Sequence, residues 1–167
     1  AKGAHETQGR GDLNGDGIPE VVTSSARAAV GGSANPMGTV YCLDGVTGQV
    51  IRTFTPPLFV VGQAFGASLV LVSDLDGDNL ADIAVGAAGM SASQGVAAGN
   101  VTVISSQTGA WIWGTDGTRP YGEMGTRLFN IGDMNQDGFD DLATNNFFTP
   151  GMTVPILSGS DGRLLWT

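Results

Sequence analysis

Short apolar stretches separated by turns rich in Gly, Ala and Ser run along this chain of 167 residues. No stretch shows apolar residues at the 3.6-residue spacing of an amphipathic helix, whereas several have the length and the residue types of strands. In the middle of the chain, four strands are expected at 68–73 (SLVLVS), 81–86 (ADIAVG), 100–105 (NVTVIS) and 110–114 (AWIWG). Several are apolar on both faces, which favours sheets that stack on neighbouring sheets. The pattern therefore predicts an all-β fold.

The same succession of features recurs with a period of about 60 residues. A polar loop starts at Asp12, Asp74 and Asp133, and a hairpin turn follows at Gly48, Gly109 and Gly162. Four strands per repeat predict β-propeller blades. We expect about three four-stranded antiparallel blades, which form an arc or part of a larger propeller, at residues 1–62, 63–122 and 123–167.

Two features of the outer repeats depart from this pattern. Segment 3–11 (GAHETQGRG) lacks apolar alternation, so the first strand of the first blade is expected to be degenerate or missing. Pro155 lies within a predicted strand of the third blade, which suggests an edge position or a bulge because proline has no amide donor.

Each polar loop carries oxygen-bearing side chains at positions 1, 3, 5 and 9. Oxygen ligands without His or Cys favour calcium over zinc or copper, and a backbone carbonyl at position 7 is expected to add a ligand. The sequence therefore predicts three Ca²⁺ sites. Their expected ligands are Asp12, Asn14, Asp16, Ile18 and Glu20 in the first loop, Asp74, Asp76, Asp78, Leu80 and Asp82 in the second, and Asp133, Asn135, Asp137, Phe139 and Asp141 in the third.

These loops differ from EF-hands. An EF-hand has a bidentate Glu at position 12 and a helix on each side, but position 12 here is Thr23, Val85 or Thr144 and the flanking residues suit strands. Position 6 needs a residue that tolerates positive φ, and it is Gly17, Asn79 or Gly138. We therefore expect calcium loops inside β-structure.

The formal charge of −9 follows from the predicted metal sites, because ten of the sixteen acidic residues are predicted ligands. Three Ca²⁺ ions would leave a charge of about −3. Such a balance argues against nucleic-acid binding, which needs a basic surface. No stretch is long and apolar enough for a membrane span. The single Cys42 aligns with Val103 and Ile156, so a buried, unreactive thiol is expected.

The landmarks resemble the FG-GAP repeat family, which forms the N-terminal propeller of integrin α subunits. Phe65-Gly66 matches the first signature pair, Gly86-Ala87-Ala88 stands where the family has Gly-Ala-Pro, and the second loop matches the family's calcium loop. The resemblance implies a calcium-stabilised, integrin-alpha-like propeller. It further implies work in cell adhesion or protein recognition outside the cell, without catalysis.

Several alternatives stay open. A lectin-like propeller would bind a glycan, with Phe59, Tyr121 or Phe147-Phe148 as sugar-stacking residues. The Trp-containing turns resemble, more remotely, the docking motif of quinoprotein propellers. No Ser/His/Asp or Cys/His set points to an enzyme, since the only histidine is His5 in the weak N-terminal segment. The tripeptide Arg10-Gly11-Asp12 matches an integrin-binding motif, but Asp12 is already a predicted calcium ligand.

Binding is expected at the end of the blades opposite the calcium loops, where the longer connections cluster. Arg119 and Tyr121 are the candidate partner-binding residues there. An arc of three blades would also leave apolar faces open, so we expect a homo-oligomer or further blades of a parent chain.

Overall fold

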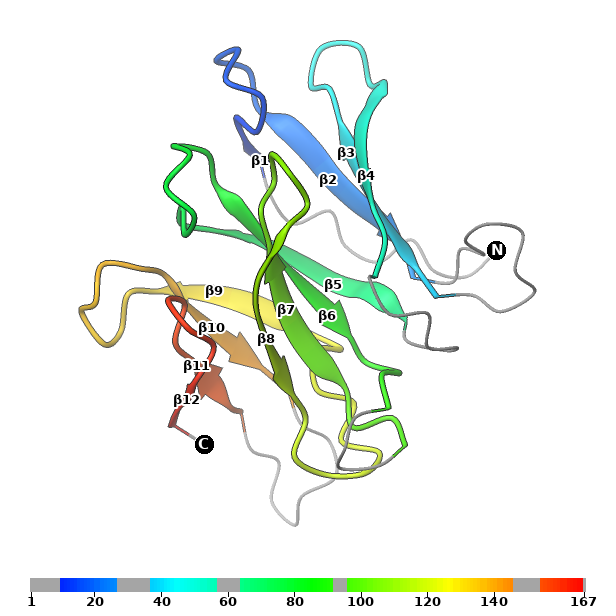
Figure 1. Cartoon of the computed structure of the whole chain (residues 1–167), viewed down its shortest axis with the longest axis vertical. Coiled ribbons are helices and arrows are strands. Elements are labelled where there is room, and N and C mark those ends of the chain that lie inside the picture. Colours follow the sequence, from blue (N-terminus) through cyan, green and yellow to red (C-terminus); the bar gives the residue numbers. More distant parts are fainter. Residues whose placement is uncertain (1–9, 27–36, 57–63, 92–95, 146–153, 167) are drawn as a thin grey trace.

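The computed structural model describes residues 10–26, 37–56, 64–91, 96–145 and 154–166. Within them, three antiparallel sheets of four strands follow one another in chain order (Figure 1). The first blade contains β1 (Arg10–Gly11), β2 (Glu20–Ser25), β3 (Thr39–Leu43) and β4 (Val50–Phe54). The middle blade contains β5 (Phe65–Val72), β6 (Asp82–Ala87), β7 (Asn100–Ile104) and β8 (Trp111–Asp116). The third blade contains β9 (Leu128–Gly132), β10 (Asp141–Thr144), β11 (Ile156–Leu157) and β12 (Leu164–Trp166).

The predicted all-β fold of propeller-type blades is confirmed. Two apolar cores lie between successive blades. The first joins Val22, Val40 and Cys42 of the first blade to residues of the middle blade such as Phe65 and Ile83. The second joins side chains of the middle and third blades, among them Val72, Val101, Val103, Leu128, Leu142 and Leu157. Both faces of the middle blade are therefore buried, which explains why β6 and β7 read as apolar throughout.

The middle blade follows the predicted strands closely, with one extension. β5 begins at Phe65 rather than at residue 68, and its pairing with β6 shifts register between Phe65 and Ser68. Gly66 allows this irregularity because its φ is +86° and its Cα lies against the side chain of Ser24 in the first blade. The strand thus bends where the two blades approach each other.

The outer blades show the expected irregularities. In the described part of the first blade, β1 is only two residues long, as the weak pattern of segment 3–11 predicted. Pro155 lies just before β11, which is an inner strand rather than an edge. Its carbonyl accepts the amide of Thr144 at 3.0 Å, so the missing proline N–H removes no bond from the ladder. β11 is shortened to two residues and contains a register shift against β12.

The acidic loops and the hairpin turns lie at one end of the blades (Figure 1). The amides of the turn residues Ser106 and Gly159 donate to Asp82 and Asp141, which ties each turn to the loop of its own blade. At the other end, segments 96–99 and 117–124 run side by side through backbone hydrogen bonds. The connections expected at 26–38 and 55–64 lie largely outside the described residues, as do His5, Phe59 and Phe147-Phe148. The described residues include no helix that could cross a membrane.

Candidate metal centres

All three acidic loops are built on one hydrogen-bond scaffold. The carboxylate at position 1 accepts the amide of position 6, and these pairs are Gly17 to Asp12 at 2.9 Å, Asn79 to Asp74 at 2.8 Å and Gly138 to Asp133 at 2.9 Å. The φ angles of the position-6 residues are +84°, +70° and +95°, which confirms the positive φ predicted there. The backbone thus folds around the first carboxylate in each loop.

The carboxylate at position 9 is fully buried in each loop, in Glu20, Asp82 and Asp141. It accepts the amide of position 2 at 2.7, 2.8 and 2.9 Å respectively. Burial raises the pKa of Asp82 to about 6, and the negative charges of Asp76 and Asp78 raise it further, while backbone hydrogen bonds from Leu75 and Ser106 oppose the rise. A cation between these carboxylates would favour the charged form.

The middle loop gathers three carboxylates around one point. Single oxygens of Asp74, Asp76 and Asp78 lie within 4.8 Å of one another. Oδ1 of Asp78 accepts the amide of Leu80 at 2.8 Å, but Oδ2 is buried and has no hydrogen-bond partner. Buried polar atoms are almost always paired, so this oxygen calls for a donor or a cation. The residues present therefore fit a divalent cation with oxygen ligands.

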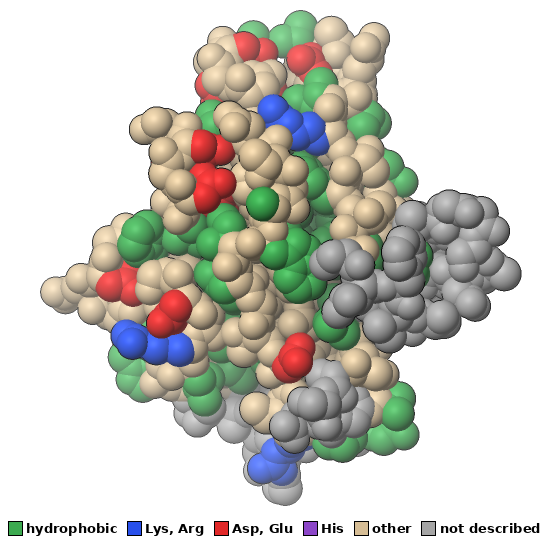
Figure 2. Space-filling model, viewed as in Figure 1, with side chains coloured by type: hydrophobic (Ala, Val, Ile, Leu, Met, Phe, Trp, Pro, Cys, Tyr) green, Lys and Arg blue, Asp and Glu red, His purple; other side chains and the backbone are tan. Residues whose placement is uncertain are grey.

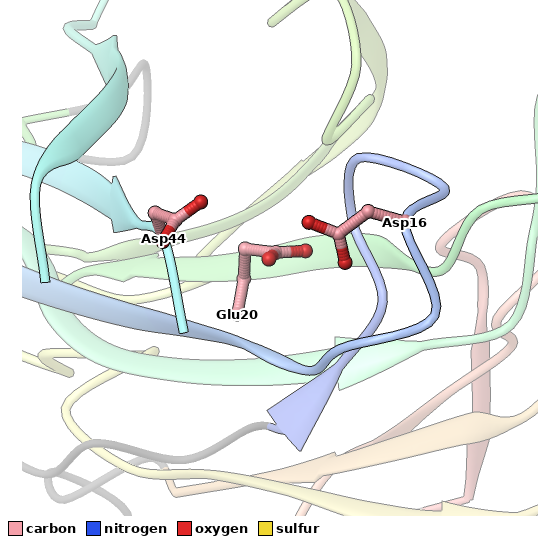
Figure 3. Close-up of side chains that lie close together, drawn as sticks. All are labelled: Asp16, Glu20 and Asp44. Carbon is pink, nitrogen blue, oxygen red and sulfur yellow. The ribbon is translucent and has the colours of Figure 1, made fainter. Parts of the chain in front are cut away.

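The first loop gathers a different set, in which Asp44 joins Asp16 and Glu20 within 4.8 Å (Figure 3). Asp44 belongs to the turn after β3, and its Oδ1 accepts the amides of Val46 and Thr47 at 3.0 and 2.7 Å. Sequence reasoning missed this residue. The available signal was its alignment with Ser105 and Ser158, since the first repeat alone has a carboxylate at this position.

Asn14 occupies the centre of the first loop with its amide nitrogen directed at carboxylates. Nδ2 donates to Asp16 at 3.0 Å and to Glu20 at 3.1 Å, while Oδ1 accepts the amide of Asp16. The amide dipole thus offsets part of the repulsion between the two acidic side chains. Coordination of a cation through Oδ1, as predicted, requires this amide to rotate.

The third loop does not bring its carboxylates together in the same way. Oδ2 of Asp137 accepts hydrogen bonds from Ser160 at 2.8 Å, from Asn135 at 3.0 Å and from Ser158 at 3.3 Å. These donors, led by the Ser160 hydroxyl, lower the pKa of Asp137. The predicted ligands are present, but hydroxyl groups of the neighbouring hairpin already satisfy the position-5 carboxylate.

Residues predicted for other roles lie away from these loops. Arg119 and Tyr121 are exposed at the opposite end of the blades. Cys42 is buried, and burial raises the pKa of its thiol to about 11, which confirms the expected unreactive core residue. The indole of Trp113 donates to the carbonyl of Gly159 at 2.7 Å, so it links the middle and third blades. Figure 2 shows acidic side chains in separate groups, several of them over the loop end of the molecule.

Comparison with known proteins agrees with this arrangement. Residues 65–104, which include the middle loop, match the FG-GAP repeat model. Integrin alpha-V of Gallus gallus is 28% identical over 139 residues, which are 80% of this chain and 13% of that protein. Integrin alpha-3 of Mus musculus is 34% identical over 109 residues, which are 63% of this chain and 10% of that protein. The chain thus spans about a tenth of the length of the curated relatives it matches.

A solved structure shares the fold. The crystal structure of rhamnogalacturonan lyase YesW superposes with a TM-score of 0.59 at 16% identity, over 99% of this chain and 31% of that one. The fold and the acidic loops define a set of β-propeller blades with candidate metal centres. The chain belongs to the FG-GAP repeat family, and its sequence is integrin-alpha-like.

Proposed function

We propose that this chain is a calcium-stabilised propeller module that recognises a protein partner outside the cell, and that it carries no catalytic activity. Its FG-GAP repeat and its similarity to integrin alpha chains support this class of function. Calcium at millimolar concentration, which loops of moderate affinity need, is found in the extracellular space. In this proposal the cations hold the loops, and recognition lies elsewhere.

The observation that carries the calcium proposal is the unpaired oxygen of Asp78 beside two further carboxylates. A buried polar atom without a partner costs about 1–3 kcal/mol, and more when it is charged. Like charges within 4.8 Å add repulsion, because none of the described basic side chains forms an ion pair with them. A divalent cation would remove both costs, and a full set of oxygen ligands favours Ca²⁺.

The test compares ions on one sample. Protein stripped with a chelator is melted alone, with CaCl₂ and with MgCl₂ at equal concentration. We expect the melting temperature to rise with calcium and far less with magnesium, because Mg²⁺ demands a tighter octahedral site. A melting temperature that does not respond to calcium contradicts the proposal.

Recognition is proposed for the end opposite the acidic loops. Tyr121 and Val96 have 55% and 59% of their surface exposed, and the amide of Tyr121 donates to the Val96 carbonyl at 2.8 Å. The amide of Glu123 donates to Ala97 at 3.0 Å, so two connecting segments brace each other. Exposed aromatic and arginine side chains on a rigid support are the usual anchors of protein interfaces.

Calcium-loaded protein applied to an array of extracellular-matrix proteins and to a glycan array tests this role. A protein ligand found there should bind about tenfold more weakly to the double variant Arg119→Ala, Tyr121→Ala, with calcium affinity unchanged. Arg163→Ala, at the other end of the blades, is the matched control and should bind normally. Binding to glycans alone would favour the lectin-like alternative instead. A protein ligand lost only in variants of the acidic loops would overturn the assignment of the surface.

A further inference from the structure

Each blade meets the next through one row of directly paired side chains. In the middle blade this row faces the third blade and runs across the four strands as Val70, Ala84, Val103 and Trp113. It packs against buried residues of the third blade that include Leu128, Leu142 and Leu157. We call this side of a blade its leading face and the side turned to the preceding blade its receiving face.

An aromatic side chain of the fourth strand meets a turn glycine at each of these interfaces. The ring of Trp113 lies so close to Gly162 that a Cβ on this glycine would collide with it. Phe54 takes the same part between the first and middle blades, where a Cβ on Gly109 would lie 2.9 Å from its ring. The hairpin glycines therefore serve as sockets for the aromatic side chain of the preceding blade.

A second apolar contact comes from position 2 of each acidic loop. Leu13 is fully buried in the core between the first and middle blades. Leu75, at the same position of the middle loop, packs against the core shared with the third blade. Each blade thus inserts one loop side chain and one aromatic side chain into its successor.

The leading face of the third blade repeats this pattern without a successor. Its paired row is Phe129, Ala143, Ile156 and Trp166, which correspond one by one to the row of the middle blade. Phe129 and Trp166 have 55% and 49% of their surface exposed. Met134, at position 2 of the third loop, is 53% exposed. Both inserting side chains, Met134 and Trp166, are therefore present and uncovered.

The receiving face of the first blade has the matching vacant sockets. A Cβ on Gly48, which aligns with Gly109 and Gly162, would have nothing within 4 Å. A hollow of about 320 Å³ lies beside it, lined by Ile18, Pro19, Val21 and Gly45. Residues aligned with two members of this lining, Ala81 and Ile83, belong to the core of the middle blade. The socket that neighbouring blades fill elsewhere is thus open here.

We propose that the leading face of the third blade docks on the receiving face of the first blade of a second copy of this chain. Trp166 would cover Gly48, and Met134 would enter the hollow beside Val21. Two such contacts would close two three-bladed arcs into a six-bladed ring with two-fold symmetry. The second copy is the favoured occupant because both halves of the contact, inserting side chains and vacant sockets, lie on this one chain. The inference depends on the blade interfaces and not on the proposed recognition surface.

Light scattering on the calcium-loaded chain measures the association directly. We expect a dimer of about 34 kDa, twice the 17.0 kDa chain. Met134→Asp should weaken dimerisation at least about tenfold, since it places a charge in an apolar contact. Gly48→Asn should do the same because asparagine tolerates positive φ while its side chain fills the socket. Val96→Asp, an equally exposed valine at the far end of the blades, should leave the dimer intact.

Calcium titration of the same variants separates loss of association from loss of folding. Met134→Asp and Gly48→Asn should retain the calcium stoichiometry of the parent chain as monomers. A parent chain that stays monomeric would overturn the proposal. A dimer that responds to Met134→Asp but not to Gly48→Asn would also overturn it, because two third-blade faces would then be paired with each other.

Discussion

The middle and third acidic loops share one scaffold but treat the same carboxylate differently. In the middle loop, Oδ2 of Asp78 is buried and unpaired. In the third loop, Oδ2 of Asp137 accepts bonds from Ser160, Asn135 and Ser158. Position 3 explains part of this difference, since Asp76 adds a charge where Asn135 adds an amide donor. The following hairpin explains the rest, because its serines reach only the third loop.

This comparison separates the geometry of a loop from its need for a cation. Both loops fix their position-1 and position-9 carboxylates through the same backbone amides. The middle loop without a cation contains uncompensated charge, whereas the third loop compensates its charge internally. We therefore expect the middle loop to bind calcium more tightly and to depend on it more strongly.

The largest expected effect is that of calcium removal. A ligand at a hundredfold excess over its Kd stabilises the folded state by about 2.7 kcal/mol per site. For a chain of this size, each such site should raise the melting temperature by about 5–10 °C. Scanning calorimetry in calcium and in chelator measures this shift. A shift smaller than that of a single site would contradict a structural role for the loops.

Asp78→Asn should change sign with calcium. In calcium, loss of a charged ligand should weaken the middle site by about tenfold or more, or about 1.4 kcal/mol. In chelator, the variant should be as stable as the parent or more stable by about 1 kcal/mol, since an amide can donate to the neighbouring carboxylates. Denaturant unfolding in both conditions measures the pair of values. Glu123→Gln, an exposed acid outside the loops, is the control and should change neither.

The double variant Ser158→Ala, Ser160→Ala should make the third loop resemble the middle one. Loss of two hydroxyl donors to Asp137 should lower stability in chelator by about 1 kcal/mol, and the freed carboxylate should then bind calcium more tightly. Unfolding curves and a calcium titration of the double variant check both parts. Lower stability in chelator with unchanged calcium affinity would show that these serines do not compete with the cation.

The smallest expected effect is that of Asp44→Asn in the first loop. Asparagine keeps the acceptor for the turn amides of Val46 and Thr47 but removes one charge near Asp16 and Glu20. A unit charge at this distance contributes about 1 kcal/mol in water, so calcium affinity of the first site should fall about twofold to tenfold. Titration resolves the change, and Asp161→Asn in the hairpin of the third blade is the matched control. Equal affinity in both variants would exclude Asp44 from the site.

The sequence predicted most of what the repeats determine. The strands of the middle blade, the positive φ at Asn79 and the burial of Cys42 all follow from local pattern and alignment. It did not predict that Asp44 approaches the first loop or that Ser158 and Ser160 reach Asp137. Those contacts depend on how a hairpin turn lies over a loop some twenty residues away, which periodicity does not encode. The register shift beside Pro155 likewise depends on the neighbouring strands.

Calorimetric titration of the chelator-stripped chain with calcium tests the central claim most directly, if it is carried out in parallel on Asp78→Asn and Asp137→Asn. The account predicts three calcium sites of unequal affinity. Asp78→Asn should weaken a tight binding step by about tenfold, whereas Asp137→Asn should affect the weakest step. Fewer than two sites in the parent chain, or a tight step unchanged in Asp78→Asn, would contradict the account.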